Sequence, residues 1–389
     1  MMSKEKWRVP KLRFPGFTED WEQRELAELC NVYDGTHQTP RYTNSGVMFV
    51  SVENIKTLES DKYISEDDFK NEFKIFPEFG DILLTRIGDV GSANIILDNI
   101  KRAYYVSLAL LKPKGVNSLF LLALLSSASV QSEIWKRTLH IAFPKKINKN
   151  EISKVIVSKP SILEQKKIGE LIYALDQIIT LHQHKLDNLK LKKKALLQKL
   201  FPKNGERYPE LRFPGFTDAW EQRKLNEFLS VSNLKNTENK YNKKNVLSVS
   251  GDYGIVNQIE FQGRSFAGAS VSNYGVVEKG DIVYTKSPLK LNPYGIIKTN
   301  RINNGIVSTL YAIYKTKENC DSKFIEHYFN LDSRLNQYLK PLVNKGAKND
   351  MKVSSENALV GEICFPQITE QAMIADLLDR LDIYITLHQ

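Results

Sequence analysis

A tandem duplication constrains this chain more than any other feature of its sequence. Residues 12–26 (LRFPGFTEDWEQREL) recur as residues 211–225 (LRFPGFTDAWEQRKL), identical at 12 of 15 positions with an offset of 199. Residues 160–183 recur as residues 366–389, identical at 13 of 24 positions with an offset of 206. The nearly constant offset predicts two copies of one fold, each with a start motif, a body of about 135 residues and a long helix.

The two bodies have diverged in sequence but keep some short motifs in the same order. Residues 80–86 (GDILLTR) match residues 280–286 (GDIVYTK), and Val106-Ser107 matches Val307-Ser308. A repeat that keeps its ends and varies its middle indicates a common attachment and a separate specificity for each body.

The second repeated segment predicts a long helix with a narrow apolar seam. On a seven-residue frame, residues 160–200 place apolar side chains at the first and fourth positions through about five heptads, and only His182 and Lys193 interrupt them. The seam comprises Ile172, Ile179, Leu186 and Leu200 at one position and Ile168, Leu175, Leu189 and Leu196 at the other. A solitary helix offers nothing against which to bury these residues. The copy at 366–389 is therefore its expected antiparallel partner.

The second helix is shorter than the first, which leaves part of the seam uncovered. Ile168, Leu171, Ile172 and Leu175 are expected to lie beyond the reach of the shorter copy. We expect either a partner protein or the segment that contains Phe14, Phe17 and Trp21 to cover them.

The residue pattern of each body predicts a mixed α/β domain built on a small, twisted, mainly antiparallel sheet. Strand-like runs rich in β-branched and aromatic residues occupy 47–52, 81–86, 93–97 and 103–112 in the first body, and 245–249, 281–285, 295–298 and 305–314 in the second. Helical spacing is found at 118–138 and 323–339, and a short helix is expected to begin within 21–29. The fold class is therefore α+β, with two similar domains separated by long antiparallel coiled-coil helices. The predicted boundaries are 1–159 and 202–365 for the two domains, and 160–201 and 366–389 for the two helices.

Charge and cysteine content indicate the kind of partner and the cellular compartment. A formal net charge of +10 and a pI near 9.2 favour a polyanionic partner. Cys30, Cys320 and Cys364 are far apart and form no CxxC pair, which is typical of reduced, buried thiols. The N-terminal segment lacks an apolar stretch of signal-peptide length, and the longest apolar run, 119–125, is too short to span a bilayer. We expect a cytoplasmic protein without a membrane partner.

Familiar catalytic motifs are missing from the sequence. It contains no phosphate-binding P-loop, no dinucleotide fingerprint and no nucleophile elbow. Asn292-Pro293-Tyr294 lacks one proline of the methyltransferase Asn-Pro-Pro-Tyr site, so it is interpreted as a turn. Glu72-Phe73-Lys74 carries only part of a nuclease triad, with Asp67 and Asp68 upstream, and is interpreted as a solvated face.

Recognition chemistry remains, because matching loops of both bodies are dense in the donors and acceptors that distinguish DNA bases. The predicted DNA-binding residues of the first body are Thr36, His37, Gln38, Thr39, Arg41, Tyr42, Thr85, Arg86, Asn94, Lys145, Lys146 and Asn148. Those of the second body are Arg264, Lys286, Ser287, Lys290, Asn292, Tyr294, Lys345 and Lys348. No residue is predicted to be catalytic or to bind a metal.

The whole plan resembles the specificity subunit of a type I restriction and modification system. The resemblance extends over essentially the entire chain. It is carried by the two LRFPGFT…W segments, the DGTHQTP loop at 34–40, the FVSVENI segment at 49–55, the two Gly-Asp-Ile segments, and the Pro-x-x-x-Glu-Gln starts of both helices at Pro160 and Pro366.

The resemblance implies a non-catalytic subunit with two target recognition domains, each of which binds one half of a split, asymmetric site on double-stranded DNA. The paired helices would set the spacer and dock two methyltransferase subunits, and restriction (translocase-nuclease) subunits would join for cleavage. The complex would use S-adenosylmethionine, ATP and Mg, but this chain would bind none of them. On this basis Arg86→Ala is predicted to alter one half-site and Lys286→Ala the other.

Two other functions are compatible with the residues. The chain could be a self-sufficient DNA-modifying enzyme with an unrecognised site, in which case it would methylate or cut DNA on its own. It could instead be a tandem-domain DNA-binding regulator, in which case it would need no methyltransferase partner.

Overall fold

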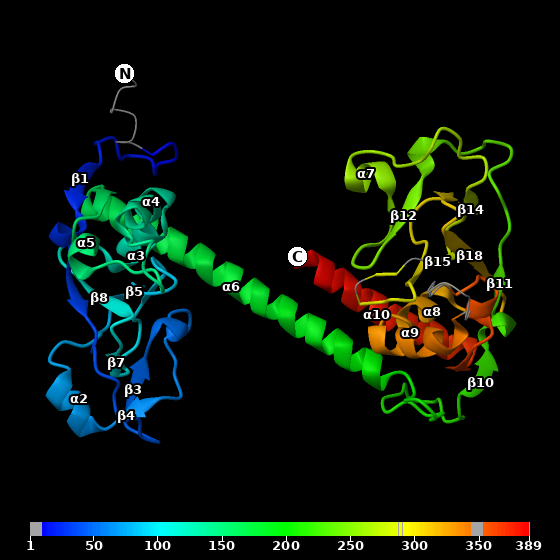
Figure 1. Ribbon diagram of the computed structural model, residues 1–389, viewed down its shortest axis with the longest axis horizontal. Coiled ribbons are helices and arrows are strands. Elements are labelled where there is room, and N and C mark those ends of the chain that lie inside the picture. Colours follow the sequence, from blue (N-terminus) through cyan, green and yellow to red (C-terminus); the bar gives the residue numbers. More distant parts are fainter. Residues whose placement is uncertain (1–9, 287, 290, 344–352, 389) are drawn as a thin grey trace. The chain divides into compact units, whose positions relative to one another are not determined.

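The computed structural model describes residues 10–286, 288–289, 291–343 and 353–388. They divide into two compact units, Met1–Leu181 and His182–Gln389, which are unit 1 and unit 2 below (Figure 1). The helix α6 (Ile162–Lys199) begins in unit 1 and ends in unit 2.

Unit 1 contains a four-stranded antiparallel sheet in the order β2-β8-β5-β6 and a three-stranded sheet in the order β4-β3-β7. Its strands are β1 (Glu22–Glu25), β2 (Cys30–Asp34), β3 (Val47–Val50), β4 (Tyr63–Ile64), β5 (Ile82–Thr85), β6 (Ala93–Ile95), β7 (Arg102–Tyr104), β8 (Leu108–Pro113) and β9 (Ile156–Lys159). Its helices before α6 are α1 (Leu26–Leu29), α2 (Glu66–Glu72), α3 (Ser118–Ser126), α4 (Ala128–Arg137) and α5 (Lys149–Ser153).

The first three residues of the central strand β5 are apolar because both of its faces are buried. Ile82 and Leu84 pack in one core with Phe120 of α3, whereas Leu83 packs in a second core with Phe49 of β3. Successive side chains of a strand point to opposite faces, so one run of three apolar residues supplies both cores.

Unit 2 repeats this plan with the four-stranded antiparallel sheet β11-β18-β15-β16. Its strands are β10 (Glu221–Lys224), β11 (Leu229–Val231), β12 (Leu247–Ser250), β13 (Gly254–Asn257), β14 (Gly275–Val277), β15 (Ile282–Thr285), β16 (Ile297–Thr299), β17 (Gly305–Val307), β18 (Tyr311–Thr316) and β19 (Glu362–Phe365). Its helices are α7 (Gln258–Gln262), α8 (Ser322–Tyr328), α9 (Asp332–Leu339) and α10 (Ile368–Leu387). The mixed α/β fold class is confirmed.

The register of the main sheet is the same in both units. Ile82 lies opposite Leu111 in unit 1, and Ile282 lies opposite Tyr314 in unit 2. The run predicted as one strand at 103–112 is two strands, and the run at 305–314 is broken in the same way. The repeated Val-Ser motif marks this break, because a turn closes there in each copy.

The short helix expected to begin within 21–29 is α1, which starts only at Leu26. Glu22–Glu25 forms strand β1, which pairs antiparallel with β9, and only α1 after it is helical. The same pairing joins β10 to β19. Local side-chain spacing could not predict the pairing of β1 with β9, because the two strands lie more than 130 residues apart in the sequence.

A buried ion pair holds each repeated helix to its start motif. Arg13 donates from Nε and Nη2 to the two carboxylate oxygens of Glu164, both at 2.8 Å. Arg212 donates in the same way to Glu370, at 2.8 and 2.9 Å. Both carboxylates are fully buried. Bidentate pairing of this kind fixes both the position and the orientation of the helix. The pairs Arg13–Glu164 and Arg212–Glu370, one in each copy of the repeat, are called the clamp below.

The glutamine after each of these glutamates fastens the same helix to the body. The backbone N–H of Asn117 donates to Gln165 Oε1 at 3.1 Å, and that of Asp321 donates to Gln371 Oε1 at 3.0 Å. Each glutamine also donates from Nε2 to the carbonyl of its own proline, Pro160 or Pro366. The Glu-Gln motif is therefore structural.

Within unit 2, α10 runs antiparallel to the C-terminal part of α6, and the two helices lie side by side in Figure 1. Both residues that interrupt the apolar seam are matched by polar residues of α10. His182 meets His388 with their Nδ1 atoms 3.2 Å apart, and Lys193 forms an ion pair with Asp382. Polar pairs at seam positions favour one register over others.

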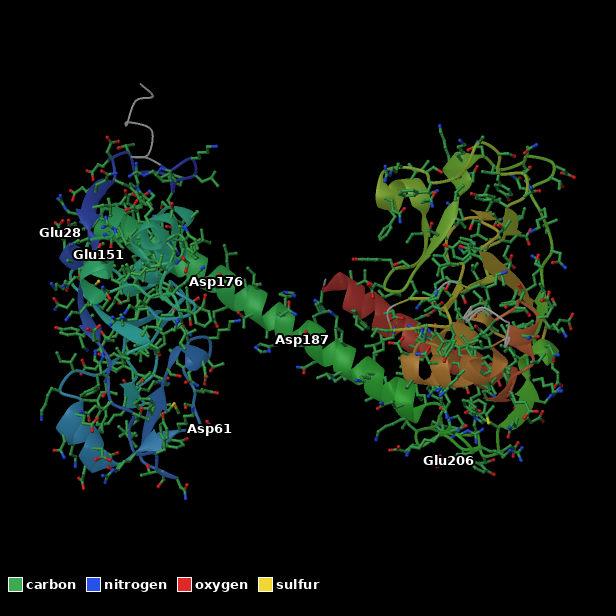
Figure 2. All side chains as sticks on the ribbon, in the orientation of Figure 1. Glu28, Asp61, Glu151, Asp176, Asp187 and Glu206 are labelled. Atoms are coloured by element: carbon green, nitrogen blue, oxygen red, sulfur yellow. The ribbon has the colours of Figure 1, made fainter. Side chains whose placement is uncertain are left out.

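The exposed seam of α6 lies in unit 1. Leu171, Ile172 and Leu175 are exposed, whereas Ile168 is half-buried against the core that also receives Trp21. Asp176, which holds in the first copy the position of Asp382 in the second, lies on this exposed stretch (Figure 2). The start segment therefore contributes cover only near Ile168.

The three cysteines are free thiols. Cys30 and Cys320 are buried, and burial raises the pKa of each to about 12. They are packing residues and poor nucleophiles at neutral pH.

Candidate nucleic-acid interface

The main sheet of unit 1 gathers the predicted recognition loops at one of its ends. Strand β2 ends at Asp34 opposite Ala109, and β5 ends at Thr85 opposite Leu108. The segments after β2 and β5 therefore leave the sheet at the same end. In unit 2 the matching strands β11 and β15 end opposite Tyr314 and Tyr311, again toward one end.

Arg86 connects three of the predicted segments. Its guanidinium forms an ion pair with Asp34 and donates from Nε to the carbonyl of Ile147 at 3.2 Å. The backbone N–H of Ile147 donates to the carbonyl of Arg86 at 2.9 Å, and that of Gly88 donates to the carbonyl of Lys145 at 2.8 Å. The segments that begin at Asp34, Arg86 and Lys145 are thus joined at one place.

Three predicted contact residues of unit 1 are scaffold rather than exposed surface. Arg86 is only 7% exposed and Thr85 is fully buried, where its hydroxyl bonds to Ser92. Asn94 donates from Nδ2 to the carbonyls of Ile55 and Lys56 at 2.9 and 3.0 Å. The prediction that these side chains project from exposed loops is wrong, since a neighbouring carboxylate and backbone groups take up their polar atoms.

The remaining predicted residues of unit 1 form an accessible polar surface. Thr36 is half-buried; the exposed ones are His37, Gln38, Thr39, Arg41, Tyr42, Lys145, Lys146 and Asn148. Tyr42 packs edge-on against buried Phe49, with ring centroids 5.8 Å apart. This contact holds one side chain of the loop in place and leaves its neighbours free to bond.

The predicted residues of unit 2 are less uniformly exposed. Arg264 is exposed, with its guanidinium carbon 4.6 Å from the centre of the Phe266 ring. Lys286 is half-buried and donates from Nζ to Ser355 Oγ at 3.4 Å. Ser287, Lys290, Lys345 and Lys348 lie outside the described residues.

Asn292 and Tyr294 are structural. The side chain of Asn292 is buried and donates to Asp332 Oδ1 at 2.8 Å, and the carbonyl of Tyr294 accepts from the hydroxyl of Tyr284. The backbone N–H of Asn292 donates to the carbonyl of Leu289, and that of Gly295 to the carbonyl of Asn292. This geometry confirms the interpretation of Asn-Pro-Tyr as a turn. The prediction that Asn292 is displayed for contact is wrong.

Sequence reasoning missed Asp34 as the partner of Arg86, and Arg13 and Arg212 as clamp residues. The signal for the arginines was available, since both stand at the same position of one repeated motif and their partners Glu164 and Glu370 stand at the same position of the other. Nothing in the sequence pairs Asp34 with Arg86, which is 52 residues away.

Within the described part of the chain, no group of three or more His, Cys, Asp or Glu residues is arranged to hold a metal ion. None of the described helices alone is long and apolar enough to cross a membrane. The helices α3 and α4, bent by 68° at their junction, have the length and composition of a membrane span only when they are taken together.

Comparison with known proteins identifies the plan. Residues 18–191 match the family described as type I restriction modification DNA specificity domain. Unit 1 and the first part of α6 are thus similar to a type I specificity domain. A Methanocaldococcus jannaschii protein with the provisional name type I restriction enzyme MjaX specificity subunit is 24% identical over 397 residues, which cover 94% of this chain and 87% of that protein.

A solved structure shares the fold of this chain. The crystal structure of the type I restriction-modification S subunit from M. genitalium covers 98% of this chain and 94% of its own, with a TM-score of 0.64 and 13% sequence identity. The resemblance inferred from the two repeats is therefore confirmed, and the shared architecture survives where little sequence identity remains.

Proposed function

We propose that this chain is the non-catalytic DNA-recognition subunit of a type I complex, in which each unit binds one half of a bipartite site. The observation that carries the proposal is the use of one sheet register twice, with different polar side chains after the matching strand ends. A shared scaffold with different loops suits the reading of two different half-sites.

The helices would set the distance between half-sites and dock two methyltransferase subunits. Exposed apolar residues support this role: Leu171, Ile172 and Leu175 on α6 in unit 1, and Ile383 and Tyr384 on α10 in unit 2. Apolar surface of this kind marks interaction sites. Restriction subunits would join the same cytoplasmic complex, and S-adenosylmethionine, ATP and Mg would be bound by the partner subunits.

Methylome sequencing of cells that express this chain with its methyltransferase is expected to reveal one split motif, with two short specific halves and a spacer of fixed length. Cells that lack this chain serve as the control. A continuous motif would contradict the bipartite role, and methylation by the purified chain alone would favour a self-sufficient enzyme. Selective binding without a recoverable methyltransferase would favour a regulator.

Substitutions of exposed loop residues are expected to act on one half-site each. Arg41→Ala should weaken binding through the half-site of unit 1 by about 1–3 kcal/mol, and Arg264→Ala should do so for unit 2, if each contacts a base. Binding is measured on duplexes altered in one half at a time. Equal weakening on all duplexes would contradict base recognition by Arg41 and Arg264.

Arg86→Ala does not test base contact, because it would release the Asp34, Arg86 and Lys145 segments together.

A further inference from the structure

The loop between α4 and α5 in unit 1 exposes two large apolar side chains to solvent. Ile141 is 99% exposed and Phe143 is 104% exposed, relative to reference values for an isolated residue. Both stand within the segment 139–146, whose sequence is LHIAFPKK. Folded proteins usually cover side chains of this size at least partly, so two fully solvated ones close together indicate a binding role.

The base of this loop is closed and fastened to the Arg86 junction. The backbone N–H of Leu139 donates to the carbonyl of Lys146 at 2.7 Å. One residue earlier, the carbonyl of Lys145 accepts from Gly88, and one residue later Ile147 bonds to Arg86. Ile141 and Phe143, called the tip below, therefore lie beside the predicted recognition segments, and hydrogen bonds fix the base of their loop.

Positive charge lies at the base of the tip. Lys145 places Nζ 4.8 Å from the centre of the Trp135 ring, and the His140 ring lies 4.0 Å from the same ring. Lys146 is exposed next to them. A partly exposed tryptophan, a histidine and two lysines thus border Ile141 and Phe143. Such a border favours a polyanion with an apolar interior over an apolar protein surface.

Duplex DNA has this combination, with phosphates outside and stacked bases inside. Proteins that bend DNA insert apolar side chains between base pairs while cationic side chains hold the adjacent phosphates. The tip matches that arrangement, because two apolar side chains occupy its apex and the cations lie at its base.

We propose that Phe143, together with Ile141, inserts between adjacent base pairs of the half-site bound by unit 1, while Lys145 and Lys146 contact the flanking phosphates. The inference rests on the proposed function and adds a wedge that unstacks one base step. The deformability of that step would then contribute to sequence preference without a hydrogen bond to a base.

The test uses the full chain and a short duplex that carries the split motif, with 2-aminopurine placed in turn at each adenine of the unit 1 half-site. Binding is expected to raise the emission of the probe at one step. Phe143→Ala should remove that rise and weaken binding by about 10- to 100-fold. Ile141→Ser should reduce both effects.

Phe79→Ala is the matched control. Phe79 is also an exposed aromatic residue of unit 1, at 65%, but it precedes β5, whereas Arg86 follows that strand. It should leave affinity and emission unchanged. The salt dependence of binding separates the two kinds of contact, since Phe143→Ala should keep the slope and Lys146→Ala should lower it by about one.

Each outcome bears on a different claim. If the wild-type chain shows no preference for the split motif, the proposed function fails. If it binds selectively but Phe143→Ala and Phe79→Ala behave alike, or no step unstacks, only the wedge is overturned. Loss of methyltransferase association by Phe143→Ala with unchanged DNA binding would overturn it too, in favour of a protein-binding loop.

Discussion

Arg212→Ala is expected to destabilise unit 2 by about 2–3 kcal/mol, because it leaves the carboxylate of Glu370 buried without its cation. The loss should not exceed the usual cost of breaking a buried pair, because the outer edge of Arg212 reaches water. The change is measured by hydrogen exchange in peptides from α10 and by urea unfolding. Arg212→Lys should recover only part of the loss, because an ammonium group cannot reproduce the bidentate geometry.

The duplication supplies the matched control for this experiment. Arg13→Ala removes the corresponding cation from Glu164 in unit 1 and should raise exchange at the start of α6 while leaving α10 unchanged. Arg212→Ala should produce the reverse pattern. If either substitution left exchange in its own unit unaltered, the clamp would contribute little to holding the helix.

The sequence predicted the elements of this fold well because each copy corroborates the other. The strand runs and the two long helices follow from side-chain periodicity, and the repeat assigned them to two similar bodies. Periodicity does not indicate how far apart in sequence two pairing strands are, which is why β1 was not predicted as a strand. Leu186 and Leu200 of the predicted α6 seam are buried, but Ile179 is 65% exposed. The two polar interruptions of the seam are the positions that meet His388 and Asp382.

The candidate site was predicted less completely because exposure depends on tertiary partners. Arg86 and Asn292 stand in polar, glycine- or proline-containing segments that indicate loops, yet both are buried against groups distant in sequence. Phe143 is the opposite case, because its aromatic side chain is of a type usually found in a core although it is fully exposed. Residue type predicts what a side chain can bind but leaves open whether the fold already supplies that partner.

Asp379 on α10 is the centre of a second electrostatic contact, and its substitution should have the other large effect. Its carboxylate accepts from His327 Nε2 at 2.8 Å and from Lys323 Nζ at 3.0 Å, and it also pairs with Arg301. His327 is fully buried. In unit 1 the equivalent position on α6 is Tyr173, so this contact belongs to the second copy alone.

Asp379→Asn is expected to destabilise unit 2 by about 3 kcal/mol at neutral pH, because three donors lose the charge that balances them. Burial by itself would raise the pKa of Asp379, but the hydrogen bonds from His327, Arg301 and Lys323 outweigh it and hold that pKa well below its usual range. A depressed carboxyl pKa contributes stability above the pKa of the unfolded chain, about 3.9, and the contribution disappears as the pH falls toward the folded value.

The difference in unfolding free energy between the wild-type chain and Asp379→Asn should therefore be constant above about pH 5 and narrow steadily below about pH 4. Urea unfolding at a series of pH values, with exchange in α8 and α10 as the local readout, measures it. Asp376→Asn is the matched control, because Asp376 is an exposed partner of Arg380 on the same helix and should change stability little at any pH. A gap between wild type and Asp379→Asn that stayed constant down to pH values where carboxylates protonate would mean that the charge of Asp379 does not stabilise α10, and that only its shape matters.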